Sequence, residues 1–254
     1  MRIARFSLAD VPAYGVLEPD SDRIVVLDGD PLFGGTKPRG EITSVDEVRL
    51  LSPVIPRSKV IGVAGNFPVD DAAAPAAPFL YAKPNTAVIG PDVPVNPPAW
   101  AGELHVETHL AVVIKSLCKN VAQADAAAVI LGYTAAADFT SATAQDADGQ
   151  WTRAKSWDTS CPLGPWIALA DEFDPAAAVL RTYVDGQVVS EAKMADAAWD
   201  AARVVAEVSS VMTLLPGDVL LCGAPAPAAR VKAGQRVDVE VSGIGSFSNP
   251  VIAL

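Results

Sequence analysis

Short apolar runs, each ended by glycine, proline or aspartate, are the feature that most limits the fold of this sequence. Its 254 residues include 18 glycines and 21 prolines, residues that interrupt helices and end strands. The apolar runs between these breaks predict strands at residues 2–6, 14–17, 23–27, 60–63, 78–81, 110–114, 166–169, 182–184, 187–189, 219–221 and 237–241. Helical character is confined to residues 122–130 and 198–215. Many short strands with few helices predict a β-rich α+β fold rather than a doubly wound sheet.

The chain divides into two predicted parts. Residues 1–55 form a small β-rich region, and the proline-punctuated segment 52–57 joins it to a main domain over residues 56–254. This length suits one large domain with a small appendage. Half of the residues are hydrophobic, so a sizeable core can be buried without disulfides or bound metal.

Charge and cysteine content limit the partners and the compartment. The formal charge of −11 argues against nucleic acid or an anionic membrane as partner, because both require clustered cations. The first ten residues do not resemble a signal peptide, and the most apolar run, residues 126–137, is shorter than the roughly 20 residues of a membrane span. Cys118, Cys161 and Cys222 are widely spaced and form no CxxC pair. We therefore expect reduced, buried thiols in a cytoplasmic protein.

The two histidines of the chain, His105 and His109, flank Glu107 at a spacing of two residues. The segment 104–114 is strand-like, and side chains of a strand alternate between its faces. These three side chains should therefore project from one face. An imidazole beside a carboxylate suits a borderline divalent cation, which makes this face a candidate metal site. The alternative is a polar strand face open to solvent.

Asp138 is the candidate third ligand. It follows the apolar, strand-like residues 133–137, and a carboxylate that ends such a run is rarely buried without a partner. The neighbouring sequence alone favours another interpretation, in which Asp138 is an N-cap or a turn residue.

Residues 150–166 are the most distinctive run of the chain. They read Gln-Trp-Thr-Arg-Ala-Lys-Ser-Trp-Asp-Thr-Ser-Cys-Pro-Leu-Gly-Pro-Trp, with three tryptophans and two cations. This run closely resembles the Gly-Gln-Trp-Thr-Arg-Ala-Lys-Ser-Phe-Asp-Thr-x-Cys-Pro-Leu-Gly-Pro motif of the fumarylacetoacetate hydrolase family. Residues 61–67, 79–91, 210–223 and 241–250 resemble further segments of that family in the same order.

The resemblance implies a fold, a metal site and a catalytic lysine. Members of the family bind Mg²⁺ or Mn²⁺ through a Glu-x-Glu-Leu pattern and a downstream aspartate, and the metal chelates an acylpyruvate-like substrate. Carried over, the metal ligands are Glu107, His109 and Asp138. Lys155 becomes the catalytic lysine that stabilises the enolate, and Gln145 becomes a substrate contact. The implied fold is a mixed β-roll or barrel with a smaller N-terminal part, assembled as a homodimer.

One departure from the family pattern concerns the metal. His109 stands where the family has its second glutamate. Mg²⁺ prefers oxygen ligands, whereas Mn²⁺ and Zn²⁺ accept imidazole readily. We therefore expect a divalent metal, Mn²⁺, Mg²⁺ or Zn²⁺, with Mg²⁺ bound more weakly than the other two.

Two further departures concern the substrate. Ala142 and Ala224 replace an arginine and a threonine that contact substrate carboxylate oxygens in the family. If the two contacts are additive, their loss costs roughly 3–4 kcal/mol of binding energy. Arg153 and Lys83 are candidate substitutes for these substrate contacts.

The last departure concerns water activation. Hydrolytic members carry a histidine and a glutamate in a lid where this chain has residues 68–75, which contain neither. Asp70 or Asp71 is a candidate base, and the alternative is a pair of solvated loop acids. Without a general base, water-dependent C–C cleavage loses roughly 10²–10⁴-fold in rate. Enolisation suffers less, because it needs mainly an electron sink.

The sequence therefore predicts a metal-dependent C–C bond hydrolase that acts on small 2-oxo or enol acids of the acylpyruvate type. Isomerisation or tautomerisation of 2-hydroxydienoates and decarboxylation of oxaloacetate are alternative reactions. A catalytically silent homologue that binds a small acid is an alternative of another class, favoured by Ala142 and Ala224 and opposed by the intact run around Lys155. Chemistry on a larger substrate also fits the two alanines, which enlarge the pocket.

Overall fold

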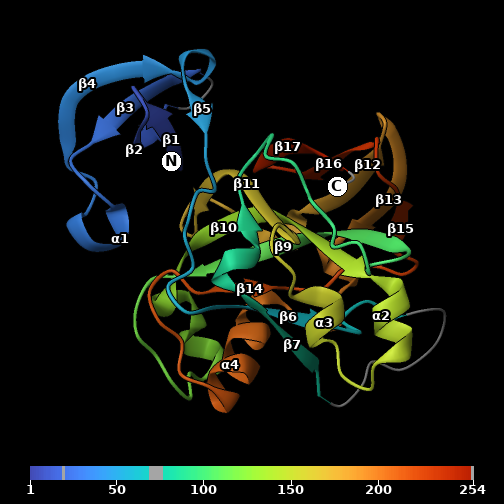
Figure 1. Cartoon of the computed structure of the whole chain (residues 1–254). Coiled ribbons are helices and arrows are strands. Elements are labelled where there is room, and N and C mark those ends of the chain that lie inside the picture. The colour runs from blue at the N-terminus through green and yellow to red at the C-terminus, as the bar shows by residue number, and fades with distance from the viewer. Residues whose placement is uncertain (19–20, 69–76, 253–254) are drawn as a thin grey trace.

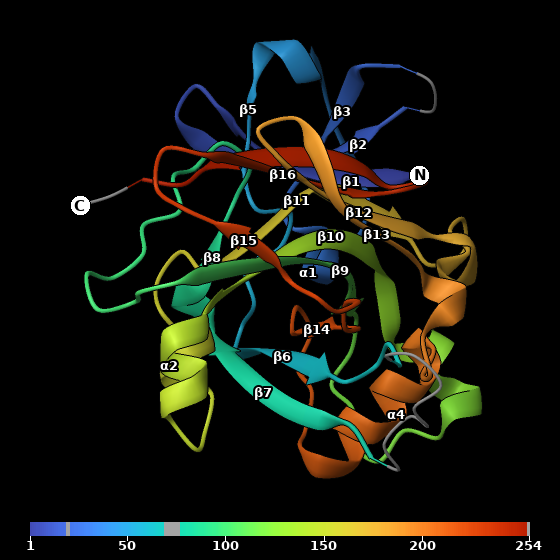
Figure 2. The same cartoon turned by 90° about the vertical axis from the view of Figure 1, so that its right-hand side faces the viewer.

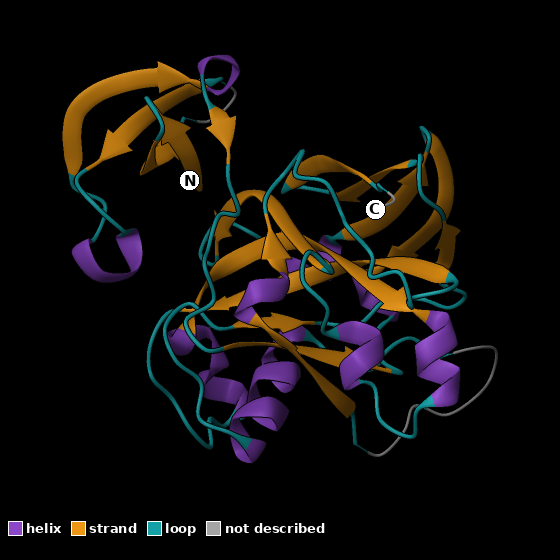
Figure 3. Cartoon of the chain, in the orientation of Figure 1, coloured by secondary structure: helices purple, strands orange, loops and turns teal. Residues whose placement is uncertain are grey.

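The computed structural model describes residues 1–18, 21–68 and 77–252 (Figures 1 and 3). Among these residues the strands are β1 (Arg2–Leu8), β2 (Val11–Leu17), β3 (Arg23–Leu27), β4 (Pro38–Ser44), β5 (Arg49–Leu50), β6 (Lys59–Ala64), β7 (Phe79–Pro84), β8 (Val88–Ile89), β9 (Leu104–Ile114), β10 (Ile130–Ser141), β11 (Cys161–Leu169), β12 (Val179–Val184), β13 (Gln187–Lys193), β14 (Val219–Leu221), β15 (Ala229–Val231), β16 (Arg236–Val241) and β17 (Gly245–Pro250). The α-helices are α1 (Pro31–Gly34), α2 (Ala142–Ala147), α3 (Thr152–Lys155) and α4 (Ala201–Val211). The 3₁₀ helices are η1 (Val45–Glu47), η2 (Asn85–Ala87), η3 (Gln123–Val129), η4 (Pro175–Ala177) and η5 (Met194–Asp196). The predicted β-rich α+β class is confirmed.

The main sheet is built around two long neighbouring strands, β9 and β10. Within the described residues its strands follow the order β4-β3-β2-β1-β11-β10-β9-β14-β6-β7, with β5, β8 and β15 paired to β1, β11 and β9. Most pairs are antiparallel, but β6 and β14 run parallel, so the sheet is mixed. The path of paired strands is open at both ends. The predicted roll or barrel is therefore an open, curved mixed sheet in this part of the chain.

A second sheet, in the order β13-β12-β16-β17, covers the side of β9 and β10 that faces away from β6 and β7 (Figure 2). Val106 of β9 and Leu180 of β12 belong to one buried apolar cluster, so hydrophobic burial holds the two sheets together. The hairpin between β12 and β13 turns at Asp185 and Gly186, which both have positive φ. This is the conformation predicted for an Asp-Gly hairpin.

The N-terminal strands form a smaller part to one side of the main body (Figure 1). β1 to β4 are antiparallel neighbours in sequence order, and β5 pairs with β1. They surround a buried cluster of their own, which contains Phe6 and Ile24. Arg2 pairs with Ala168, so β1 also extends the edge of the main sheet at β11.

The helices are shorter than the sequence predicts. α4 begins where the Asp200 side chain accepts the N–H of Arg203 at 2.7 Å, and it buries Val204 and Val208. It ends before the predicted limit at residue 215, because Leu214 forms a β-bridge with Cys118. The predicted helix at 122–130 is the 3₁₀ helix η3.

Cys118, Cys161 and Cys222 are buried and free of disulfides, as predicted. Asp70 and Asp71, the candidate lid bases, lie outside the described residues. Within the described ranges, the helices are too short or too polar to cross a membrane.

Candidate functional site

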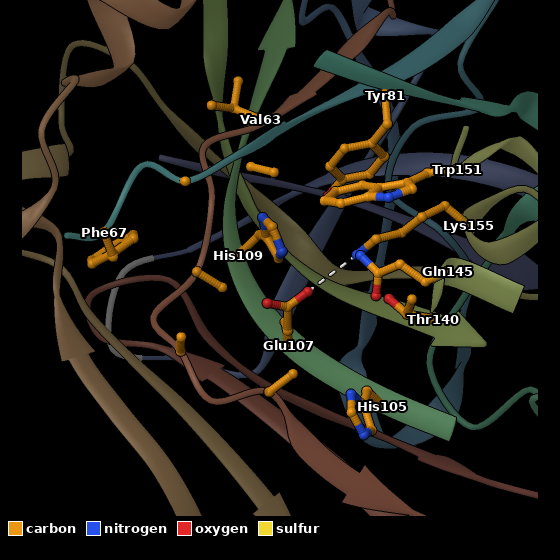
Figure 4. A pocket seen from close by; sticks show the side chains of 15 residues that line it. Val63, Phe67, Tyr81, His105, Glu107, His109, Thr140, Gln145, Trp151 and Lys155 are labelled. Atoms are coloured by element: carbon orange, nitrogen blue, oxygen red, sulfur yellow. Dashed lines mark hydrogen bonds and ion pairs between the residues drawn. The ribbon is translucent and has the colours of Figure 1, made fainter. Parts of the chain in front are cut away.

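One cavity of about 230 Å³ gathers most of the predicted site residues (Figure 4). β9 contributes one face of the cavity, and β6, β7, β10, α2, α3 and the loops after β6 and β14 contribute the rest. Figure 4 shows Val63 and Phe67 on one side and Lys155, Gln145 and Thr140 on the other. The lining residues are Val63, Ala64, Gly65, Phe67, Tyr81, His105, Glu107, His109, Thr140, Gln145, Trp151, Lys155, Ala224, Ala226 and Ala228.

β9 carries three polar side chains on its cavity face. His105, Glu107 and His109 all line the cavity, while Val106 between them is fully buried on the opposite face. The prediction that the three share a face is confirmed, and it follows from the two-residue period of a strand. The polar face is therefore a cavity wall rather than open surface.

Asp138 lies directly opposite Glu107 in the antiparallel pair of β9 and β10. β10 continues through Asp138 to Ser141, so the interpretation of Asp138 as a helix N-cap or turn residue is wrong. β10 is buried on both faces along nearly its whole length, and this carboxylate is 0% exposed. Directly opposed residues of neighbouring strands are close in space, which brings the two carboxylates together.

The spacing of the predicted ligands suits a metal ion. One donor atom from each of Glu107, His109 and Asp138 lies within 4.8 Å of the other two. The buried Nε2 of His109 has no hydrogen-bond partner among the described residues. Buried polar atoms are rarely left without partners, so this nitrogen indicates a group that the protein itself does not supply. By their spacing and their carboxylates, these residues can hold a divalent cation.

Lys155, the last residue of α3, enters the gap between the two carboxylates. Its Nζ lies 2.6 Å from Asp138 Oδ2 and 3.1 Å from Glu107 Oε2. Burial lowers the pKa of Lys155, but Asp138 and Glu107 outweigh burial, and the pKa is raised on balance. The cavity therefore holds a fixed ammonium group at neutral pH.

Tyr81 is a site residue that sequence analysis missed. Its hydroxyl donates to Asp138 Oδ2 at 2.5 Å, and burial followed by the charges of Asp138 and Glu107 raises its pKa, which keeps the phenol protonated. A Cβ on Gly62, its cross-strand neighbour, would lie 2.0 Å from the ring, so glycine leaves room for Tyr81. Tyr81 is two residues from Lys83 in a strand, so the two side chains share a face. This spacing is the signal that could have indicated Tyr81.

Lys83 lies behind Asp138 and does not line the cavity. It is fully buried, with Nζ 2.7 Å from Asp138 Oδ1. Nζ also donates to Phe139 O at 3.2 Å, to Ser160 O at 3.1 Å and Ser160 Oγ at 3.0 Å, and to the carbonyl of Lys155. The protein uses all donors of this ammonium group. The sequence predicted Lys83 as a substrate contact, but its ammonium group does not reach the cavity. Lys83 instead compensates the charge of Asp138.

The two remaining predicted contacts lie in different places. Gln145 lines the cavity from α2, a helix that begins where Ser141 Oγ accepts a backbone N–H. Arg153 does not line the cavity. Its side chain is about half exposed and forms a bidentate pair with Asp148 at 2.7 and 2.8 Å. The structure thus brings Gln145, and not Arg153, to the place where a substrate can bind.

His105 has an acidic partner that sequence analysis also missed. Its Nε2 lies 2.7 Å from Glu103 Oε1, and Arg230 Nε lies 3.1 Å from the same oxygen. A carboxylate beside an imidazole orients the ring and selects its tautomer. Glu103 lies directly before β9, and its two-residue spacing from His105 is the signal that could have indicated this pair.

Comparison with known proteins identifies the family. The family description "Fumarylacetoacetate (FAA) hydrolase C-terminal" matches residues 56–252. The chain belongs to the fumarylacetoacetate hydrolase family. The description "Rv2993c-like, N-terminal" matches residues 1–53.

Three members of this family illustrate the likeness. The structure of 5-carboxymethyl-2-hydroxymuconate delta-isomerase from Mycobacterium smegmatis is 41% identical, covers 100% of both chains and has a TM-score of 0.93. Oxaloacetate tautomerase fahd2 of Xenopus laevis is 32% identical over 226 residues, which are 83% of this chain and 70% of that one. The structure of maleylpyruvate hydrolase from Sphingobium sp. SYK-6, in complex with manganese(II) ion and pyruvate, is 28% identical with a TM-score of 0.82, covering 100% and 99% of the two chains.

The family match confirms the predicted family, and the likeness to the solved structures confirms the predicted fold. Members of the family are enzymes named as isomerase, tautomerase or hydrolase, and one of them binds manganese. In this member of the family, two carboxylates and two ammonium groups cluster beside a buried imidazole. The cluster is electrically balanced when that imidazole is neutral, and burial lowers the pKa of His109.

Proposed function

We propose that this protein is an enzyme that enolises a small 2-oxo acid, as an isomerase or tautomerase does. The proton on the carbon beside the oxo group passes to water, the electron pair of that C–H bond forms the enolate, and a proton from water then returns to the enolate at oxygen or carbon. The single observation that carries the proposal is the ammonium group of Lys155, held between Glu107 and Asp138 at the wall of a cavity. An ammonium group fixed in a partly dehydrated site stabilises the negative oxygen of an enolate. The names of two relatives, an isomerase and a tautomerase, support this reaction class.

The residues of the cavity suit the separate parts of such a substrate. Lys155 offers its ammonium group to the oxo oxygen as charge develops there, and Gln145 offers an amide to the carboxylate. Trp151, Phe67 and Ala224 form an apolar part of the wall, which suits the hydrocarbon part of the acid. Tyr81 donates to Asp138 and so holds that carboxylate in place.

A metal fits this scheme at the same residues. A divalent cation held by the carboxylates of Glu107 and Asp138, beside His109, would polarise the oxo and carboxylate oxygens as a Lewis acid. The manganese of the maleylpyruvate hydrolase structure supports a metal of this class.

Incubation with oxaloacetate, acetylpyruvate and fumarylpyruvate in the presence of Mn²⁺, Mg²⁺ or Zn²⁺ tests the proposal. We expect the enol absorbance of at least one acid to change at a rate proportional to protein concentration, with the carbon skeleton recovered intact by NMR. Protein treated with a chelator is the control for the metal. Absence of turnover with every acid and metal would contradict the proposal and favour a silent homologue that binds a small acid.

Hydrolysis is a second candidate, because His105 lines the same cavity and the carboxylate of Glu103, outside the cavity, lies 2.7 Å from its Nε2. In hydrolysis, the oxygen of water bonds to the distal carbonyl carbon while the C–C bond breaks. The electron pair of that bond leaves with the pyruvate-like fragment as its enolate. His105 is the described residue that can take the proton of this water, in place of the lid pair that the sequence lacks.

His105→Gln separates the two candidates. We expect this change to lower kcat for acylpyruvate cleavage by about 10²-fold, the lower end of the range for a general base. Tautomerisation of oxaloacetate should change much less. Glu103→Gln, which keeps the imidazole, is the matched control and should have a smaller effect on cleavage. Equal losses in both reactions would mean that His105 supports the cavity and does not activate water.

A further inference from the structure

The ring of His109 accepts a hydrogen bond from a closely packed backbone N–H. The N–H of Gly223 donates to His109 Nδ1 at 3.1 Å. Gly223 has φ +92°, and a Cβ there would lie 2.6 Å from the Cβ of Asn66. Asn66 is fully buried and is fixed in turn by hydrogen bonds to the backbone of Trp199 and Cys222. The direction of the Gly223 N–H is therefore set by the fold.

This hydrogen bond decides which nitrogen of His109 carries the proton. A neutral imidazole has one N–H and one lone pair, and a protonated imidazole has no lone pair. Because Nδ1 accepts from Gly223, the ring is neutral and Nε2 is the nitrogen that carries hydrogen. Nε2 thus offers a donor, whereas the lone pair that a metal requires is already used at Nδ1.

The donor at Nε2 is directed into the cavity and is unused. Figure 4 shows the ring of His109 and the ammonium group of Lys155 both above Glu107 in this view. Nε2 is buried and has no hydrogen-bond partner in the described part of the chain. The nearest carboxylate oxygen, Asp138 Oδ2, is 3.8 Å away, and it already accepts from Lys155 and Tyr81. Nε2–H is therefore available to a bound acceptor.

We propose that the Nε2–H of His109 and the ammonium group of Lys155 together bind one oxyanion of the substrate, and that His109 is not a metal ligand. Both nitrogens lie within 3.8 Å of Asp138 Oδ2, so they are close to each other, and both residues line the cavity, where one small anionic group can meet them. The acceptor is a carboxylate or enolate oxygen of the 2-oxo acid, and in this respect the inference rests on the proposed function. Any divalent cation is then held by the carboxylates of Glu107 and Asp138.

Two substitutions at His109 distinguish this assignment from direct metal ligation. His109→Gln keeps both hydrogen-bonding roles of the ring. Its amide oxygen can accept from the N–H of Gly223, while its NH₂ group donates into the cavity. His109→Glu keeps only the acceptor and places a carboxylate oxygen where the donor was. If the imidazole donates, the first change should leave Mn²⁺ affinity within about twofold of the wild type, and the second should tighten it by about tenfold or more, because an added carboxylate ligand strengthens binding.

Mn²⁺ binding measured by electron paramagnetic resonance, with no turnover required, gives the decisive readout. We expect pulsed spectra of the Mn²⁺-loaded wild type to lack the hyperfine coupling of a directly bound imidazole nitrogen. If Mn²⁺ does not bind to the wild type or to His109→Gln, a gain of binding in His109→Glu still supports the inference. A directly bound nitrogen, a weakening of about 10–100-fold or more in His109→Gln, or no gain in His109→Glu would overturn it.

Binding of oxalate, a dianion shaped like the enolate of pyruvate, tests the second half of the inference without metal. In the presence of a chelator, we expect His109→Gln to bind oxalate about as well as the wild type. His109→Glu should lose about 10–100-fold in affinity, the fold-change for one charged hydrogen bond. Thermal melting of each variant confirms that it is folded. Equal oxalate affinity in both variants would overturn the oxyanion role, and it would leave the proposed reaction to the separate turnover assay.

Discussion

Replacing Lys155 with methionine is expected to lower kcat/KM for the 2-oxo acid by about 10³-fold, as the loss of a main oxyanion donor does. Within the described part of the chain, Lys155 is the lysine or arginine that lines the cavity, since Lys83 is enclosed behind Asp138. Methionine retains most of the length and volume of the lysine stem but cannot donate a hydrogen bond. The loss should therefore appear mainly in kcat, because an enolate is more negative at oxygen than the ground-state acid.

Lys59→Met is the matched control for this experiment. Lys59 forms an ion pair of 2.5 Å with the buried Asp218, away from the cavity. Loss of this pair removes a similar interaction without touching the site, so turnover should be retained. If Lys155→Met keeps at least a tenth of wild-type activity while remaining folded, the ammonium group does not stabilise the reacting oxygen.

Replacing Asp138 with asparagine is expected to destabilise the fold by about 3–5 kcal/mol, the range for breaking a buried ion pair from one side. The carboxylate is fully buried and is within 2.7 Å of both Lys83 and Lys155. Asparagine leaves Lys155 with Glu107 as its charged partner and leaves Lys83 with no ion pair among the described residues. Because a typical domain is stable by only about 5–15 kcal/mol, this loss is a large part of the total.

Urea unfolding measures the Asp138→Asn effect, and a double substitution tests its cause. Adding Lys83→Met removes the ammonium group that Asp138→Asn leaves unpaired, so the double variant should be more stable than the sum of the single effects predicts. Additive effects would mean that the charge of Lys83 is not compensated by Asp138.

The charge of Asp138 also sets the behaviour of the protein in acid. Burial raises the pKa of this carboxyl, but Lys155 and Lys83 outweigh burial, and the folded pKa is lowered. The ionised carboxylate therefore contributes its full stability above the unfolded pKa of about 3.9, and this contribution is lost as the pH falls towards the folded value. As the pH falls through this range, the free energy of unfolding of Asp138→Asn should therefore decrease less than that of the wild type. At neutral pH the variant should remain the less stable of the two.

The sequence by itself determined the class of fold, the family and one face of the site. Short apolar runs between glycines and prolines were enough for a β-rich fold, because strand alternation and turn chemistry are local properties. The same two-residue period placed His105, Glu107 and His109 on one face of β9 before any pairing was known. Residues 150–166 were specific enough to indicate the family.

Only the tertiary structure decided what these side chains contact. Asp138 meets Glu107 because β10 pairs with β9 in one register, and local sequence could not distinguish that strand from a turn. Lys83 points to a buried carboxylate rather than to the cavity. The proton of His109 is placed by a backbone N–H that lies 114 residues further along the chain. Register, burial and hydrogen bonds between distant segments depend on the whole fold, and no periodicity in the sequence encodes them.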